Sequence, residues 1–225
     1  MRYNHTGYKG MKMKTEKLKE YSIRIGLLLL AVLIISFCGS ALVVAGIGGD
    51  AVLVFEQGIS SVLQLEIGTG ILIINVVLSI LLWIINKKMI HIGTFVVALL
   101  LGPMINLIIG WGWLPIPVSL LERIVMVFVA ILFLSFALAI YIYANIGYSP
   151  FEGILLTIKQ KVKMRFAFIK IINDASLFII GWLLGGTIGI GSVMTVILLG
   201  PLIDLFTHLV KKTKWLPETG PVKSI

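Results

Sequence analysis

Six long apolar runs constrain this chain more than any other feature. A helix needs about 20 apolar residues to cross a 30 Å hydrocarbon layer, and a chain of 225 residues that is 59% hydrophobic and 13% charged is too apolar for one water-soluble core. The sequence therefore predicts an all-α polytopic membrane protein with six transmembrane helices. The expected spans are residues 23–46, 67–85, 90–110, 120–145, 166–186 and 189–210.

Two further apolar segments are too short and too charged to cross a bilayer. They read AVLVFEQGISSVLQL at residues 51–65 and PFEGILLTIKQKVKM at residues 150–164. Each predicts a short helix that either lies amphipathically on the membrane surface or re-enters it from one side. Glu56 and Glu152 would line a cavity in the re-entrant case and would be solvated in the other.

The basic residues predict the orientation of the spans. Of the nineteen Lys and Arg residues, only Arg123 falls outside the termini and loops of one side when the N-terminus is cytoplasmic. We therefore expect both termini in the cytoplasm. The net charge of +9 is explained by orientation and by anionic lipid headgroups. Nucleic acid is not an expected partner, because no recognition motif accompanies the charge.

The chain also repeats itself. With a shift of 99 residues, RIGLLLLAVLIISF from Arg24 matches RIVMVFVAILFLSF from Arg123 at six of fourteen positions. With a shift of 98, HIGTFVVALLLGPMINL from His91 matches GIGSVMTVILLGPLIDL from Gly189 at eight of seventeen. The shared Arg, Trp, Gly-Pro and Asn/Asp positions occur in the same order, which indicates a duplication.

Three spans in each copy require the second copy to enter the membrane from the opposite face, giving an inverted 3+3 repeat. Many secondary transporters have this arrangement, with sites where the repeats meet, although it also builds a stable bundle with no transport role. The expected organisation is a basic cytoplasmic N-terminal tail, two repeats of three spans and one short helix each, and a cytoplasmic C-terminal tail. Their ranges are 1–22, 23–118, 119–210 and 211–225.

Asp174 lies near the middle of the fifth span, where an isolated carboxylate costs on the order of 3 kcal/mol. The equivalent residue in the second span is Asn75, whose amide can donate to a carboxylate. We expect the two to meet near the axis relating the repeats, as a binding site for substrate or ion. The alternative is a hydrogen-bonded Asp that only joins helices.

A second Asn/Asp exchange lies near the span ends. Asp204 is one turn before His208, so the two share a helix face and could hold a proton. An interfacial pair near Lys211 and Lys212 explains them equally. The inverted counterpart of Asp204 is Asn106, which we expect near the outer surface.

Gly102-Pro103 and Gly200-Pro201 stand at equivalent places in the third and sixth spans. Proline removes one helical hydrogen bond and permits a kink. A kink at the same place in both repeats predicts a pair of hinges for a transport movement, or else a packing device.

Several stretches resemble the YczE/YitT group of bacterial integral membrane proteins. They are GIGGDAVLVFEQGIS from Gly46, IGYSPFEGIL from Ile146, NDASLFIIGWLLGGTIGIGS from Asn173 and the two Gly-Pro motifs. The resemblance covers nearly the whole chain after residue 22. It implies a location in the bacterial cytoplasmic membrane and supplies no substrate, since the group has no settled biochemical activity.

These features favour a transporter of a small solute or ion. The alternative is a non-transporting scaffold or regulatory protein that binds a partner through its basic ends. An enzyme is not expected, because the acidic residues and His are too scattered to form a nucleophile–base or metal set. The single Cys38 lies within an apolar run, and neither a cofactor nor a metal is predicted. The oligomeric state is left open.

Overall fold

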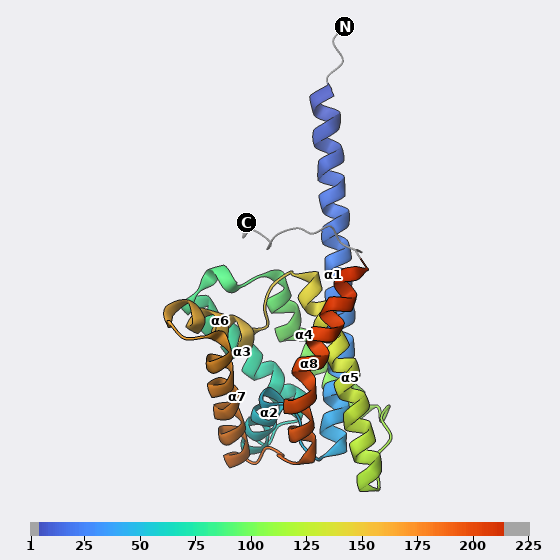
Figure 1. The fold of residues 1–225 in the computed structure, drawn as a ribbon, viewed down its shortest axis with the longest axis vertical. Helices are drawn as coiled ribbons and strands as arrows, with labels where there is room; N and C mark the ends of the chain where they lie inside the picture. Colours follow the sequence, from blue (N-terminus) through green and yellow to red (C-terminus); the bar gives the residue numbers. More distant parts are fainter. Residues whose placement is uncertain (1–4, 214–225) are drawn as a thin grey trace.

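A computed structural model describes residues 5–213, with side chains from Leu18 onward. This part of the chain is helical and contains no β-strand (Figure 1). Residues 214–225, most of the predicted C-terminal tail, lie outside it. The helices are α1 (His5–Ala45), α2 (Ala51–Val62), α3 (Ile67–Ile85), the 3-10 turn η1 (Lys87–Met89), α4 (Ile92–Gly110), α5 (Leu120–Ala144), α6 (Pro150–Lys161), α7 (Phe166–Leu183) and α8 (Ile190–Lys212).

Six of these helices are long and apolar enough to cross a membrane, and they correspond to the six predicted spans: Leu18–Ala45 of α1, and α3, α4, α5, α7 and α8. The predicted fold class is confirmed. The main difference is at the N-terminus, where α1 begins at His5 and continues through the segment expected to be a separate tail. No glycine or proline follows Gly10 before the first span, so nothing in the sequence stops this helix.

The helix ends show the repeat directly. Adding 99 to the end of α1 (Ala45) gives the end of α5 (Ala144), and adding 99 to both ends of α2 gives the ends of α6. The start of α4 plus 98 is the start of α8. α1 runs downward in Figure 1 and α5 runs upward beside it, so the two copies are inverted. The predicted inverted 3+3 arrangement is thus present in the fold.

Two arginines join the copies by reciprocal hydrogen bonds. Arg24, near the start of the first span in α1, donates through Nη1 to the carbonyl of Ala144 at 2.8 Å. Arg123 at the lower end of α5 donates through Nη1 to the carbonyl of Ala45 at 2.9 Å. A cation at the last carbonyls of a helix satisfies acceptors that have no intrahelical donor and complements the helix dipole. Each copy therefore caps the equivalent helix of the other.

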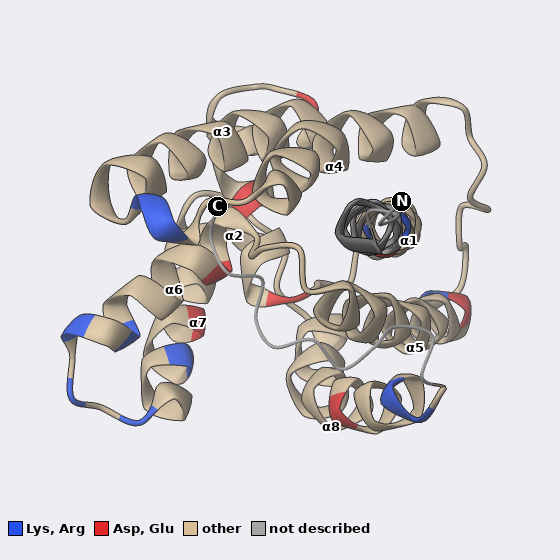
Figure 2. Cartoon of the chain, turned by 90° about the horizontal axis from the view of Figure 1, so that it is seen from above, with Lys and Arg blue, Asp and Glu red and all other residues tan. Residues whose placement is uncertain are grey.

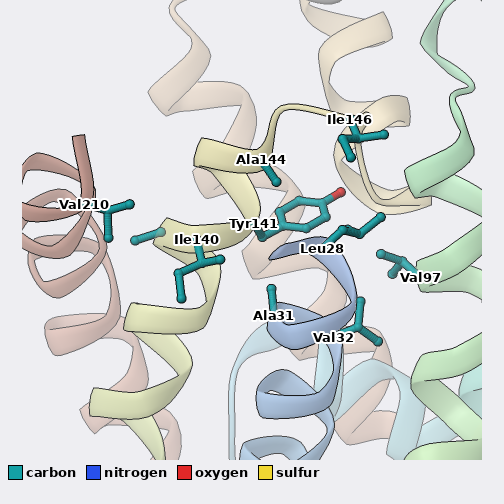
Figure 3. Packing of buried hydrophobic residues seen from close by; sticks show 10 residues of the cluster. Leu28, Ala31, Val32, Val97, Ile140, Tyr141, Ala144, Ile146 and Val210 are labelled. Carbon is teal, nitrogen blue, oxygen red and sulfur yellow. The ribbon is translucent and has the colours of Figure 1, made fainter. Parts of the chain in front are cut away.

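The core lies between α1 and α5. Close to the upper end, Leu28, Val32, Tyr141 and Ala144 pack together with side chains of α4 and α8 (Figure 3). Small residues along α1 and α5 let these two helices approach closely; Ala31, Ala45, Ala137 and Ala139 are fully buried. The contact holds the two repeats together along their whole length.

The short helices pack inside the bundle. α2 packs against α7 and α3, and α6 packs against α3 and α7. The contact of α2 with α7 depends on Gly58 and Gly181, because a Cβ on either would overlap the backbone of the other helix. Of the two alternatives that the sequence left open, this packing favours re-entrant helices over helices on the surface.

The two repeats differ in how their last helices pack. In both repeats the last helix packs along the first, α4 on α1 and α8 on α5, but α4 also packs along α3, whereas α8 has no comparable contact with α7. Seen from above, α7 and α8 stand apart, with α7 beside α6 and α8 beside α5 (Figure 2). Only 11% of the span windows of α7 and α8 is buried, against 39% for α3 and α4. The second repeat is open where the first is closed.

Candidate functional site

A carboxylate and an amide meet at the middle of α3. Glu56 of α2 is buried, with 4% of its surface exposed, and its Oε1 accepts a hydrogen bond from Asn75 Nδ2 at 3.2 Å. The same Nδ2 donates to the carbonyl of Ile71 at 2.9 Å. The helical spacing of α2 brings Glu56 to the same face as Leu53 and Ser60, both buried. This pair is the most deeply buried polar contact between side chains of different helices in the described part of the chain.

Asp50 lies at the start of α2 and joins this region. Its side chain accepts from the Leu53 backbone N–H at 3.0 Å and so caps the helix. Ser149 holds the equivalent place at the start of α6, in a capping box with Glu152. The two short helices approach each other at the rings of Phe55 and Phe151, which contact edge to face with centroids 6.3 Å apart.

Asp174 is paired along its own helix. Its Oδ2 accepts from Lys170 Nζ at 2.9 Å, and its Oδ1 accepts from Asn173 Nδ2 at 3.2 Å. Asn75 donates to Glu56 and not to Asp174, so the structure does not form the predicted Asn75–Asp174 pair. The reason is that α2 inserts between α3 and α7 and presents its own carboxylate to the amide. Asp174 remains in the same region, because its charge and that of Lys170 both act on Asp50.

Glu152 lines a small cavity of about 280 Å³ at the upper end of the bundle. Two tyrosines share it, and the Tyr141 hydroxyl donates to the carbonyl of Gly147 at 3.0 Å. Phe166 at the start of α7 closes one side. The cavity places one of the predicted acids where α5, α6 and the start of α7 meet.

Burial sets the electrostatics of the three acids on the short helices. It raises the pKa of Glu56 to about 8, an effect that the charge of Asp50 increases and the Asn75 hydrogen bond reduces. Burial also raises the pKa of Asp50 and of Glu152, and in both cases the positive charge of Lys170 acts in the opposite direction. Four carboxyl groups and one lysine thus form a single coupled group around α2, α6 and α7, whose acidic positions are red in Figure 2.

The residues predicted near the span ends behave differently in the two repeats. Asn106 accepts from the Gly68 backbone N–H at 2.7 Å and donates to Glu66 at 2.8 Å and Thr69 at 3.1 Å. It therefore caps α3. Asp204 and His208 are exposed on α8, and no hydrogen bond joins them.

The two Gly-Pro motifs also differ. Gly102 is buried, and a Cβ there would overlap the carbonyl oxygen of Gly68. Gly200 is exposed, with nothing within 4 Å of the place a Cβ would take. Pro103 and Pro201 both lie inside continuous helices. In the first repeat, at least, the motif provides close helix packing.

An apolar surface groove lies remote from these acids. It has a volume of about 920 Å³ between α1, α5 and residues 114–117, and its lining is apolar apart from Glu122. Such a groove suits lipid chains. Among residues 18–213 no three His, Cys, Asp or Glu side chains are grouped to hold a metal ion.

Two features of the structure are not predicted by the sequence alone: the reciprocal arginine caps and the Glu56–Asn75 pair. The alignment of Arg24 with Arg123 was visible, but their reciprocal capping needs the antiparallel contact of α1 with α5. The Glu56–Asn75 pair is not predicted, because the repeat makes Asn75 and Asp174 equivalent and so predicts that these two residues pair with each other. The offset of 99 places Leu155 opposite Glu56, and an acid present in only one copy marks a site where the copies diverged.

Comparison with known proteins gives a family and no activity. Residues 22–208 match the model of a family of unknown function, DUF6198. An uncharacterized protein of Haemophilus influenzae is 26% identical over 197 residues, covering 86% of this chain and 87% of that protein. The uncharacterized protein YyaS of Bacillus subtilis is 27% identical over 195 residues, covering 81% and 92%.

No solved structure matches this chain. The comparisons do not extend to the YczE/YitT group that the motifs resemble. The two relatives described above are bacterial proteins. The six long apolar helices of this chain are typical of a multi-pass membrane protein. The match over residues 22–208 includes both repeats and every acid described above, so the chain belongs to the DUF6198 family.

Proposed function

We propose that this protein transports a small solute or ion across the bacterial cytoplasmic membrane, with a positively charged solute preferred. The observation that carries the proposal is the buried Glu56–Asn75 pair, beside Asp50 and Asp174, at the junction of two inverted repeats. Ionisable groups at membrane depth are costly and mark ion or proton pathways. Transporters of this architecture bind their substrates where the repeats meet.

The charge balance of the centre supports a cation. Asp50, Glu56, Glu152 and Asp174 supply four carboxyl groups and Lys170 a single positive charge. A solute cation near Asp50 and Glu56 would stabilise their ionised forms, so its binding would release protons. This links solute entry to proton movement in the opposite direction.

The asymmetry of the repeats supports alternating access. The first repeat is closed by the contact of α3 with α4, while α7 and α8 of the second repeat make no comparable contact and the Glu152 cavity lies at the upper end, by the start of α7. With the N-terminus in the cytoplasm, as the basic residues predict, this upper end faces the cytoplasm. The structure would then correspond to the inward-facing state.

Proteoliposome currents test the proposal. Vesicles containing the protein would be exposed to steps of Na⁺, K⁺, guanidinium and tetramethylammonium on a solid-supported membrane. We expect a current with at least one cation, lost in Glu56→Gln and in Asp174→Asn and kept in the exposed control Glu122→Gln, whose amide can still cap α5. Currents unchanged in both Glu56→Gln and Asp174→Asn would overturn the assignment of the site.

A second candidate is a scaffold or regulator, favoured by the extension of α1. This helix continues from the first span to His5, well beyond the ends of the other helices (Figure 1). The segment before the span carries Lys9, Lys12, Lys14, Lys17 and Lys19. Such a helix suits an acidic protein partner or anionic headgroups. Deletion of residues 1–17 would then abolish the cellular phenotype, while Asp174→Asn would leave it intact.

A further inference from the structure

We propose that the C-terminal half of α8 closes onto the start of α7, with Asp204 capping α7 and pairing with Arg165. The inference rests on the proposed transport function, because it describes the second state that transport requires. It is drawn from the first repeat, where the equivalent closure is already formed.

The closed repeat shows which contacts are involved. There Gly68 of α3 lies against Gly102 of α4, and Asn106 one turn later accepts from the Gly68 N–H and donates to Glu66. Glycine at both places lets the backbones touch. The amide then fixes the distance between the helices by capping one with a side chain of the other.

The open repeat holds the matching glycine of α8 and an ionisable side chain one turn later, both unused, but it has Ala167 where the first repeat has Gly68. A Cβ at Gly68 would overlap the Gly102 carbonyl oxygen and Asn106 Oδ1, so the closed contact of the second repeat must be wider than that of the first. Adding 99 to Gly68 gives Ala167 and to Glu66 gives Arg165; adding 98 to Gly102 gives Gly200 and to Asn106 gives Asp204. Ala167, Arg165, Gly200 and Asp204 are all exposed. α7 has no side-chain cap at its start, and within the described residues Asp204 has no hydrogen bond or ion pair. The exposed Gly200 leaves space for the start of α7.

The change from Asn106 to Asp204 is matched by the change from Glu66 to Arg165. In the first repeat a neutral amide meets Glu66; in the second, a carboxylate would meet Arg165. An amide can donate to an acid, whereas a carboxylate pairs with a guanidinium, so both combinations are complementary. A carboxylate at the start of α7 is also favoured by the helix dipole. In this account Asp204 caps α7 and pairs with Arg165. This role differs from the two that the sequence suggested, a proton-holding pair with His208 and an interfacial charge.

The anchoring of α8 allows such a movement. At its lower end the Gly191 N–H donates to the carbonyl of Ile47 at 2.8 Å, and Gly191, Ser192 and Thr195 are buried. The equivalent residues at the start of α4 (Gly93, Thr94 and Val97) are buried as well. The helices differ beyond these first turns, toward Gly102 and Gly200. The lower end of α8 therefore acts as a pivot, and the Gly200-Pro201 segment is where the helix can bend. Closure also requires Val210 and Phe206, near the upper end of α8, to leave their contacts with α5.

Chemical crosslinking tests the contact without any assay of transport. In a Cys38→Ser background, Arg165→Cys/Asp204→Cys would be treated in proteoliposomes with a short bis-methanethiosulfonate. Glu66→Cys/Asn106→Cys is the matched positive control, and Arg165→Cys/Ile190→Cys, at opposite ends of α7 and α8, is the negative one. We expect the first repeat's pair to link fastest, the Arg165/Asp204 pair to link within single chains, and the negative control not to link.

The contrary results are distinct. A failure of the Arg165/Asp204 pair to link, while the Glu66/Asn106 pair does, would overturn the closure. Links formed only between chains would also overturn it, because the open face would then be covered by a second copy. Intramolecular links in a protein that carries no current would leave the closure standing and remove the transport function.

Charge reversal gives an independent reading in the cation-current assay. Arg165→Asp and Asp204→Arg should each lower the current at least 10-fold, and the double variant should recover most of it. Because both side chains are exposed in the structure, the thermal midpoints of the variants should match that of the parent. Equal currents in all four proteins would contradict the pairing.

Discussion

Most helix boundaries recur in the two repeats while the packing differs, which separates what the duplicated sequence determines from what the conformational state of the molecule determines. Helix starts, helix ends and the arginine caps recur at offsets of 98 or 99. The contact between the last two spans occurs in one copy only. Features that recur are determined locally by capping, glycine and apolar pattern. The feature that differs is a rigid-body arrangement, which the same local rules permit in two forms.

The glycines of the Gly-Pro motifs should give the largest contrast. Gly102→Ala adds a methyl group that overlaps the Gly68 backbone, and we expect a loss of about 3 kcal/mol in stability. Gly200→Ala should raise stability by about 0.5 kcal/mol, since alanine favours a helix and meets nothing there. Unfolding in mixed detergent micelles would measure both. Equal losses would show that the second repeat is closed as well.

The arginine caps should differ in strength although their geometry is the same. Arg24 is buried and also pairs with Glu20 at 2.8 Å, whereas Arg123 is only partly buried. Because removing a buried charged donor leaves its partners desolvated, we expect Arg24→Gln to cost about 2 kcal/mol and Arg123→Gln about 1 kcal/mol. The same unfolding assay measures both. A cost near zero for both would mean that the reciprocal caps do not hold the copies together.

Glu56 should make stability depend on pH, and no residue in the second repeat occupies its place. An acid that titrates near 4.5 when unfolded and near 8 when folded keeps its proton in the folded state, so stability falls as pH rises through that interval. We expect Glu56→Gln to raise the thermal midpoint by about 4 °C at pH 8.5 and to leave it unchanged at pH 4.5. Leu155→Gln at the equivalent place should show no such pH dependence.

Asn106 and Asp204 should differ by the smallest amount. Asn106→Ala removes the cap of α3, at a cost of about 1 kcal/mol. Asp204→Ala removes a side chain with no partner in the described structure and should change stability by less than about 0.5 kcal/mol. Micelle unfolding of the two variants in parallel gives the comparison. A larger loss for Asp204→Ala would mean that the closed second repeat is already the dominant state.

The fold could be predicted from the sequence because each span is long, apolar and bounded by charge or glycine. The six spans, the two short helices and the inverted copies followed from these patterns alone. The site was only partly predictable. Asp174 is predicted to be costly at membrane depth, and Asn75 is identified as its equivalent in the other repeat. Glu56 and Glu152 are predicted to line a cavity only if their helices re-enter the membrane. The partner of Asn75 depends on α2 lying between α3 and α7. No pattern within a single helix carries that information.

Spin-label distances test most directly whether the repeats exchange states. In a Cys38→Ser background, labels at Leu65 and Trp111 report on the first repeat, and labels at the equivalent Met164 and Leu209 report on the second. We expect a single short distance for the first pair at pH 5, and for the second pair a long distance with a minor short one. When the pH is raised to 9, the population with the short distance should increase for the second pair. The population with the short distance should decrease for the first pair under the same change. A second pair that remains long under both conditions, with an unchanged first pair, would contradict the exchange.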